Sequence, residues 1–122
     1  MRLEGPALRL TIFIGETDSY RHRPLYNEIV RRARKAGLAG ASVFHGIEGF
    51  GVSSRIHATH VLHLREERPI TIVIVDAAER IRAFLPSLAE LIPSGLVTID
   101  NVHVVHYADQ SQPSQPRERR SG

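Results

Sequence analysis

The chain has 122 residues, of which 42% are hydrophobic, enough for one domain with a core. It contains no cysteine, which excludes disulfides, thiolate catalysis and cysteine-ligated zinc. The formal net charge is only +3 and three arginines lie in 116–122, so we expect no nucleic-acid partner.

No apolar run approaches the roughly 20 residues of a membrane helix. The first ten residues also lack the hydrophobic region of a signal peptide. We therefore expect a cytoplasmic protein.

The first half of the chain reads as strand, helix, strand. Residues 8–16 are almost continuously apolar after Arg9, as in a central buried strand. A helix is predicted over 24–37, with Pro24 at its first position and Gly37 as its C-terminal cap. A second strand is expected over 39–49.

After a polar connection at 51–69, the pattern repeats. The run "LTIFIGE" at 10–16 matches "ITIVIVD" at 70–76 with an offset of sixty residues. The next helix has an apolar face made of Ile81, Phe84, Leu85, Leu88 and Ile92.

Two local irregularities are expected in this second half. Pro86 lies inside the helix and should kink it or split it in two. The last strand, 95–107, should carry a bulge or bend at Asp100 and Asn101.

Two strand–helix–strand units in so short a chain predict an α+β, ferredoxin-like fold. It would have a four-stranded antiparallel sheet with both helices on one face. The domain would span 1–107, and the polar, proline-bearing segment 108–122 is expected to be disordered.

Three glycines and one carboxylate occur between His45 and Gly51, where the second strand enters the longest connection. A glycine-rich turn with free N–H groups can bind an anion, and Arg55 could add a charge for a phosphate. The alternative is a β-bulge followed by an exit turn, which the residues alone favour.

Two further groups of polar residues allow a functional and a structural interpretation. Glu16 and Asp18 could form an acid/base pair, but a helix-entry loop whose Asp18 or Ser19 bonds backbone amides is favoured. His57, His60 and His63 recur every three residues and could bind a metal, although a solvated loop is favoured. A trimeric histidine-dependent metal-binding protein is thus the alternative function.

An enzyme is not expected. The sequence has no nucleophile–base pair, and its glycine segment leads into a loop, unlike a dinucleotide-binding fingerprint. The connection "TDSYRHR" has no glycine, whereas acylphosphatases place a glycine-rich phosphate loop there.

Residues 8–107 resemble the PII-like family catalogued as domain of unknown function 190. The similar motifs are "IGETD", "PLYNEIV", "GLAGASV…GIEGFG", "RPITIVIVD", "FLP" and "GLVTIDNV". More distantly, "GLAGAS" and "GFG" are similar to the segments that bracket the second strand of classical PII signalling proteins. Those are ferredoxin-like homotrimers that bind adenine nucleotides between subunits.

The resemblance implies a nucleotide site at equivalent positions. Gly49, Phe50 and Gly51 would hold phosphates at the base of a T-loop-like segment, about 51–69. Ser42 would face the adenine, and Thr71 and Val73 would line the same cleft.

The chain departs from classical PII at several phosphate-binding positions. Val52 and Ser53 replace a basic and an amide residue, and "LIPSGLVT" before the last strand has no basic residue. We therefore expect AMP or ADP in preference to ATP. The flexible loop would relay the bound state to a partner, with a membrane transporter or channel as a candidate.

Overall fold

The computed structural model describes residues 3–51 and 68–108. Its elements in chain order are β1 (Gly5–Gly15), β2 (Ser19–Tyr20), β3 (Arg23–Pro24), α1 (Leu25–Lys35), β4 (Ser42–His45), β5 (Pro69–Asp76), α2 (Ala78–Leu91) and β6 (Leu96–Val104). Neither described helix is long and apolar enough to cross a membrane.

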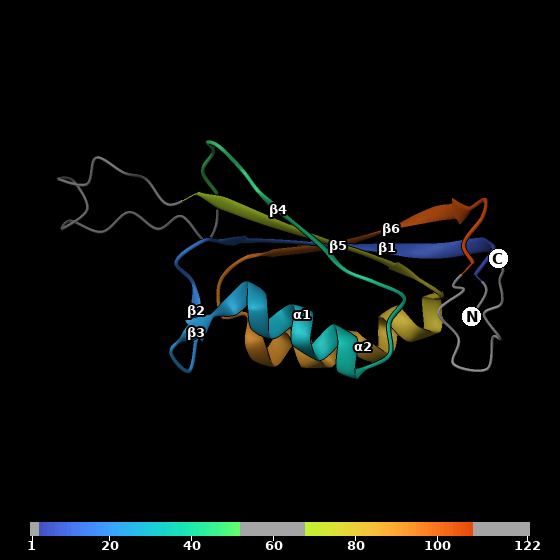
Figure 1. Ribbon diagram of the computed structural model, residues 1–122, viewed down its shortest axis with the longest axis horizontal. Coiled ribbons are helices and arrows are strands. Elements are labelled where there is room, and N and C mark those ends of the chain that lie inside the picture. The colour runs from blue at the N-terminus through green and yellow to red at the C-terminus, as the bar shows by residue number, and fades with distance from the viewer. Residues whose placement is uncertain (1–2, 52–67, 109–122) are drawn as a thin grey trace, which may run out of the picture.

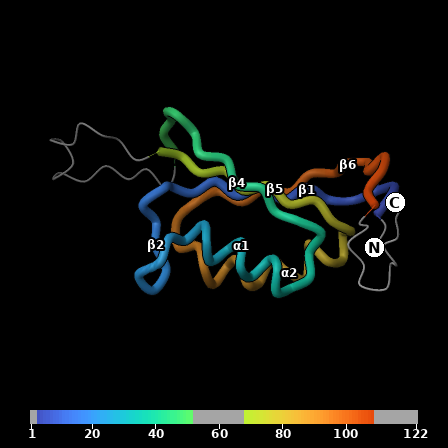
Figure 2. The backbone as a smooth tube through the Cα atoms, in the orientation of Figure 1, coloured from blue at the N-terminus to red at the C-terminus, as the bar shows by residue number. Residues whose placement is uncertain are grey.

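Four strands form one antiparallel sheet in the order β4-β5-β1-β6, and both helices cover the same face of it (Figure 1). The start of β1 and the end of β6 lie together at one end of the sheet (Figure 2), where Gly5 is opposite Val104. The predicted α+β, ferredoxin-like fold is confirmed.

The core lies between the sheet and the helices. Alternate residues of β1 and β5 point toward the helices because side chains on a strand alternate between its two faces. The core side chains are Leu8, Leu10, Ile12, Ile14, Ile70, Ile72 and Ile74 from the sheet, and Leu25, Ile29, Ala33, Ile81, Phe84, Leu88 and Leu91 from the helices.

The sixty-residue repeat has a direct structural meaning. β1 and β5 are antiparallel neighbours, and Ile12 is opposite Ile72, the residue sixty positions later. Both side chains are fully buried. The two halves of the chain are therefore related by an approximate twofold axis that passes between these residues.

The end of α1 matches the predicted glycine cap. Gly37 has a φ of 79°, its N–H donates to the Arg34 carbonyl, and the Leu38 N–H donates to the Ala33 carbonyl. This is a Schellman motif. Pro24, predicted at the first helical position, instead lies one residue earlier, as the N-cap.

Several predicted boundaries were wrong. β1 begins at Gly5 rather than at residue 8, because its first residues pair with β6. β4 covers only Ser42–His45 and not 39–49. On its N-terminal side the Ala39 N–H is taken by the carboxylate of Asp76, so no ladder forms there.

The structure also bears on the two predicted irregularities. α2 is not split, and Pro86 lies on its exposed side, where water can replace the missing N–H donor. A bulge at Asp100 and Asn101 is wrong, because β1 and β6 pair without interruption there. Asp100 instead forms a two-bond ion pair with Arg9 on the opposite strand.

The connection between β1 and α1 contains a small hairpin that the sequence analysis did not predict. β2 and β3 pair, and the two residues between them, Arg21 and His22, have φ values of 51° and 72°. As predicted, Asp18 bonds a backbone amide, accepting from the Gly15 N–H at 2.9 Å.

Candidate functional site

The sheet face that points away from the helices carries the expected nucleotide-site residues of β4 and β5. Ser42 is directly opposite Val73, and Phe44 is directly opposite Thr71. Residues opposite each other in an antiparallel pair project from the same face. Ser42, Thr71 and Val73 are therefore brought together, as the resemblance implied.

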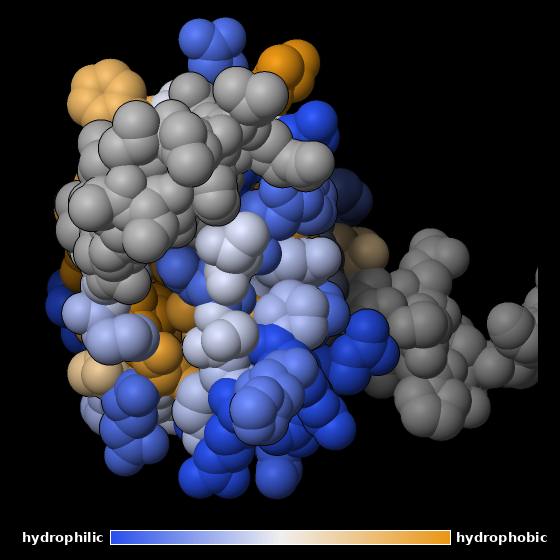
Figure 3. All heavy atoms as spheres, turned by 90° about the vertical axis from the view of Figure 1, so that its left-hand side faces the viewer, coloured by the Kyte–Doolittle hydropathy of each residue, from blue (hydrophilic) through white to orange (hydrophobic). Residues whose placement is uncertain are grey.

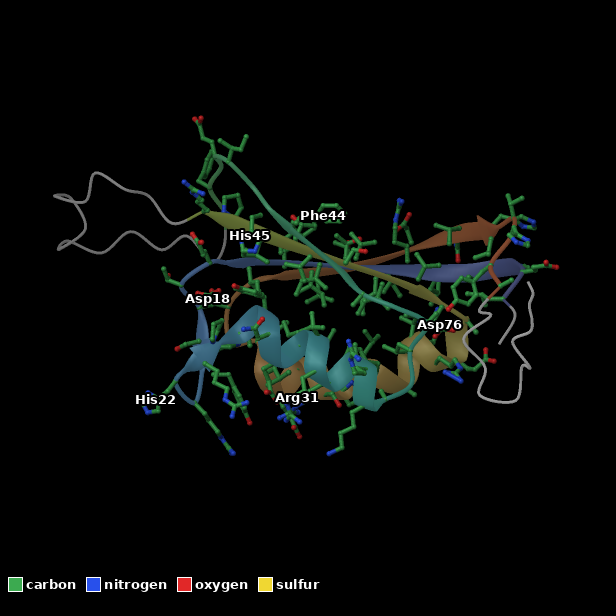
Figure 4. The ribbon with its side chains drawn as sticks, viewed as in Figure 1. Asp18, His22, Arg31, Phe44, His45 and Asp76 are labelled. Atoms are coloured by element: carbon green, nitrogen blue, oxygen red, sulfur yellow. The ribbon has the colours of Figure 1, made fainter. Side chains whose placement is uncertain are left out.

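Each of these two opposite pairs continues as a row of side chains across β1 and β6. The row of Ser42 and Val73 continues through Thr11 to Thr98, and the row of Phe44 and Thr71 continues through Phe13 to Leu96. Figure 4 shows Phe44 on the side of the sheet opposite the helices. We call these eight residues the open face.

The open face is accessible, and its large apolar side chains lie in the row of Phe44, Phe13 and Leu96. Phe44 is 56% exposed, Leu96 47% and Phe13 39%. Clusters of exposed large apolar side chains of this kind usually mark an interaction surface.

The glycine segment begins where β4 ends. The Gly46 N–H donates to the Pro69 carbonyl at 2.7 Å, which holds this segment against the first residue of β5. Phe50 is 95% exposed and Ile47 is 90% exposed. The segment therefore presents its large apolar side chains to the surroundings.

The glycines of this segment have different structural roles. A Cβ atom on Gly46 would lie 2.5 Å from the Pro69 Cγ, and one on Gly49 would lie 3.3 Å from it. A Cβ on Gly51 would meet nothing within 4 Å, and its φ is not in the left-handed range. The fold of the described residues thus requires glycine at 46, and gives no steric reason for it at 51.

Asp76 anchors the other end of β4, and sequence analysis did not single it out. Its buried carboxylate accepts from the Ala39 N–H at 2.9 Å and from the Ala77 N–H at 2.6 Å. Arg80, whose Nη1 donates to the Gly37 carbonyl, has the same nitrogen 3.9 Å from Asp76. These contacts fix the residues that lead to Ser42.

The only sequence signal for Asp76 was the acid that ends each repeat of "LTIFIGE" and "ITIVIVD". Its burial depends on the chain turning back past Ala39, thirty-seven residues earlier. That approach is a tertiary contact, which the local sequence does not encode.

Some proposed site residues lie outside the described residues. These are Arg55 and the metal-site alternative of His57, His60 and His63, together with most of the connection 51–69 and most of 108–122. Within 3–51 and 68–108, no three His, Cys, Asp or Glu side chains are grouped so that they could hold a metal ion.

The described site residues form one wall rather than an enclosure. Ser42 and Phe44 are exposed, Thr71 and Val73 are half-buried, and β4 is an edge strand of the sheet. An edge strand presents backbone N–H and C=O groups that a ligand or another chain can bind. The glycine segment extends this wall beyond the end of β4.

Comparison with known families shows which family the chain belongs to. Residues 7–104 match DUF190 (Uncharacterized ACR, COG1993). The chain belongs to the DUF190 family. This confirms the resemblance seen in the sequence motifs.

The DUF190 assignment is supported by two curated relatives. A UPF0166 protein of Aquifex aeolicus is 34% identical over 97 residues, which cover 80% of this chain and 91% of the relative. The UPF0166 protein MJ1524 of Methanocaldococcus jannaschii is 33% identical over 96 residues, covering 78% and 88%.

Solved structures of CPII from Thiomonas intermedia K12 share the fold of this DUF190 chain. One, bound to ADP, AMP and acetate, has a TM-score of 0.52 at 18% identity and covers 82% of this chain and 89% of CPII. Another, described as a nitrogen regulatory PII-like protein bound to ADP, AMP and bicarbonate, has a TM-score of 0.51. It is also 18% identical, with 81% and 88% covered.

Proposed function

We propose that this protein is a non-catalytic regulator that binds an adenine nucleotide, AMP or ADP in preference to ATP, between the subunits of a homotrimer. The observation that carries the proposal is the wall formed by exposed Ser42 and half-buried Thr71 and Val73, which continues into the glycine segment. CPII, which has the same fold, is known with ADP and AMP bound.

The geometry of the wall suits a nucleotide. The hydroxyls of Ser42 and Thr71 and the edge of β4 offer hydrogen bonds to a base. Ser42 and Gly46 are four residues apart on an extended chain, about 13 Å at the usual strand rise. That span is comparable to the length of an adenosine phosphate, so the phosphates would reach Gly46, where the segment that leads to Gly49–Gly51 begins.

The phosphate end would depend on main-chain N–H groups. Gly51 has space where a side chain would otherwise stand, so a phosphate can approach its backbone closely. Arg55 would add a guanidinium nearby. Few cationic groups at this end would favour a nucleotide with one or two phosphates.

A second subunit would supply the opposite side of the cleft. The open face, with its exposed Phe13, Phe44 and Leu96, gives another copy an apolar surface on which to pack. Cyclic trimers are closed by one repeated heterologous interface, which would create three equivalent clefts.

Nucleotide binding would change how a partner protein binds the connection that follows Gly51. Contacts to Gly49–Gly51 would restrict the start of this connection and so change which conformations it adopts. A membrane transporter or channel is the partner that the family resemblance favours.

The test is calorimetric titration with AMP, ADP, ATP and cyclic AMP, with and without magnesium. AMP or ADP is expected to bind, and Gly51→Ala to weaken that binding at least about tenfold, the effect of losing one good polar contact. Its unfolding midpoint should stay at the wild-type value, since the added methyl meets no atom of residues 3–51 and 68–108 within 4 Å.

Matched variants distinguish the loss of a ligand contact from a loss of folding stability. Arg55→Ala should weaken binding, whereas Arg82→Ala, an exposed arginine on α2, should not. Gly46→Ala should lower stability itself, because its methyl would collide with Pro69. Absence of heat with every nucleotide, or wild-type affinity in Gly51→Ala, would contradict the proposal.

A further inference from the structure

Positive charge is concentrated on one part of the surface, away from the open face. Between Tyr20 and Lys35 the chain carries six cations and one carboxylate, Glu28. In contrast, α2 carries two arginines and two glutamates. The cations form what we call the basic surface: Arg21, Arg23, Arg31, Arg32, Arg34 and Lys35.

The basic surface is built by two elements that meet. The β2–β3 hairpin supplies Arg21 and Arg23, and the outward side of α1 supplies the other four cations. Figure 4 shows Arg31 on the side of α1 that faces away from the sheet and His22 at the hairpin tip. In Figure 3, strongly hydrophilic side chains gather around this hairpin.

Two of the arginines are held in place by a buried acid. Arg31 donates to the Glu28 carboxylate through Nε at 3.2 Å and Nη2 at 3.0 Å, and Arg32 donates to it through Nε at 2.9 Å. The Nη1 groups of both arginines take no part in these bonds. A guanidinium fixed in this way loses little side-chain entropy when it binds an anion.

Tyr20 extends this network to the hairpin. Its hydroxyl accepts from Arg32 Nη2 at 3.2 Å, and the Cζ atoms of Arg21 and Arg32 lie 5.1 Å and 5.5 Å from its ring centroid. Arg32 therefore holds the hairpin to α1 by one cation–π contact and one hydrogen bond, whereas the contact of Arg21 with Tyr20 lies within the hairpin.

The turn that carries Arg21 is strained. Arg21 and His22 both have positive φ, where asparagine and glycine are usually found. Non-glycine residues adopt this conformation at an energetic cost that surrounding contacts must offset. Strain retained at a cationic tip is a second feature, besides charge, that points to function.

We propose that the basic surface is a docking site for the headgroups of an anionic lipid bilayer. The six cations are distributed over a projecting hairpin and the outer side of a helix, so they do not converge on a single small anion. A bilayer presents phosphates and carboxylates repeatedly in one plane, which matches a spread of exposed cations.

The attachment would be electrostatic and reversible. None of the exposed large apolar side chains lies between Tyr20 and Lys35, so the basic surface has nothing to insert into the acyl region. Binding should therefore be lost when salt screens the charges. This inference does not depend on the proposed nucleotide site, whose residues lie on other elements.

The test is co-sedimentation of the full chain with phosphatidylcholine vesicles, with or without about 30 mol % phosphatidylserine. The wild type should sediment with the anionic vesicles at low salt only, and be released at about 0.5 M NaCl. It should not sediment with pure phosphatidylcholine.

Two triple variants of equal net charge decide whether the basic surface is responsible. Arg23→Gln/Arg34→Gln/Lys35→Gln removes three exposed cations of this surface and should reduce the vesicle partition coefficient at least about tenfold. Arg117→Gln/Arg119→Gln/Arg120→Gln removes three from the C-terminal segment and should bind nearly as the wild type does. Circular dichroism and thermal unfolding verify that both variants fold.

Three outcomes would overturn the proposal. The first is no binding of the wild type to anionic vesicles at low salt, including the case in which it binds duplex RNA or an acidic peptide instead. The second is equal loss of binding in both triple variants, which would indicate attraction by net charge alone. The third is wild-type binding by the basic-surface variant.

Discussion

Glu28 is a buried charged side chain on α1, with only 4% of the residue exposed. Its carboxylate accepts hydrogen bonds from Arg31 and Arg32, which lower the pKa of Glu28 to about 2. In the unfolded chain a glutamate has a pKa of about 4.3. The ionised carboxylate therefore stabilises the folded state fully above about pH 4.3, and that contribution is lost as the pH falls toward 2.

We expect Glu28→Gln to lower the unfolding temperature at pH 7, because two arginines lose their anionic acceptor. The difference from the wild type should shrink as the pH falls from about 4.3 toward 2, where Glu28 itself becomes neutral. Thermal unfolding followed by circular dichroism across this range measures it. Glu90→Gln, an exposed glutamate of α2, is the control, and a gap that did not change with pH would refute this account.

The reason why glycine occupies a position also differs among the glycines between His45 and Gly51. Gly46 is required because Pro69 occupies the place of a side chain, while Gly51 has no such neighbour among the described residues. A glycine that the fold does not need is a better candidate for ligand contact than one that it does. This distinction makes Gly51→Ala informative about binding and Gly46→Ala informative about folding.

At the element scale, β4 is a four-residue edge strand that is held at both ends. At one end the Gly46 N–H donates a hydrogen bond to the Pro69 carbonyl. Near the other end the Asp76 carboxylate accepts a hydrogen bond from the Ala39 N–H. So short a strand has few ladder bonds of its own. The position of Ser42 in the proposed nucleotide-binding wall therefore depends on these two anchors.

Asp76→Ala should free the segment before β4. It leaves the half-buried Ala39 N–H without its acceptor, which costs about 1–3 kcal/mol of unfolding free energy. Hydrogen exchange should quicken first at the amides of 39–45, and nucleotide affinity should fall with it.

The matched control is Asp100→Ala. It removes an exposed carboxylate on β6, the opposite edge strand of the sheet, where Asp100 pairs with Arg9 of β1. Exposed ion pairs contribute about 0–1 kcal/mol, so this variant should leave exchange in 39–45 unchanged. Equal protection of 39–45 in Asp76→Ala and wild type would show that Asp76 does not anchor β4.

At the scale of the whole molecule, one face of the sheet is covered by helices and the other is open. The open face has large apolar side chains in the row that contains Phe44, and two of them, Phe13 and Leu96, pair across β1 and β6. The proposed trimer accounts for this asymmetry, because neighbouring subunits would cover the face that the helices leave bare.

We expect Phe13→Asp to convert a trimer into monomers, since it places an unpaired charge inside the proposed interface. Size-exclusion chromatography with light scattering measures the mass. Val105→Asp, at a position 84% exposed and beyond the end of β6, should remain trimeric. A wild type that is monomeric at all concentrations would contradict the trimer, as would a trimeric Phe13→Asp that is as stable as the wild type.

Much of the fold follows from the sequence alone. Apolar runs at 10–16 and 70–76 identify the central strands, and Gly37 ends the first helix through a conformation that glycine adopts readily. These features are local, because strand and helix periodicity and turn chemistry depend on near neighbours. The family motifs added the expected positions Ser42, Thr71 and Val73, which the strand register then brought together.

Other features were decided only by tertiary contacts. The hairpin at Arg21 and His22 lacks the glycine or asparagine that usually announces such a turn, and Arg32 and Tyr20 hold it against α1. The length of β4 depends on Asp76 and Pro69, which approach it from distant parts of the chain. The sequence specified which segments form strands and helices, whereas strand ends, anchors and exposed faces arose where those segments met.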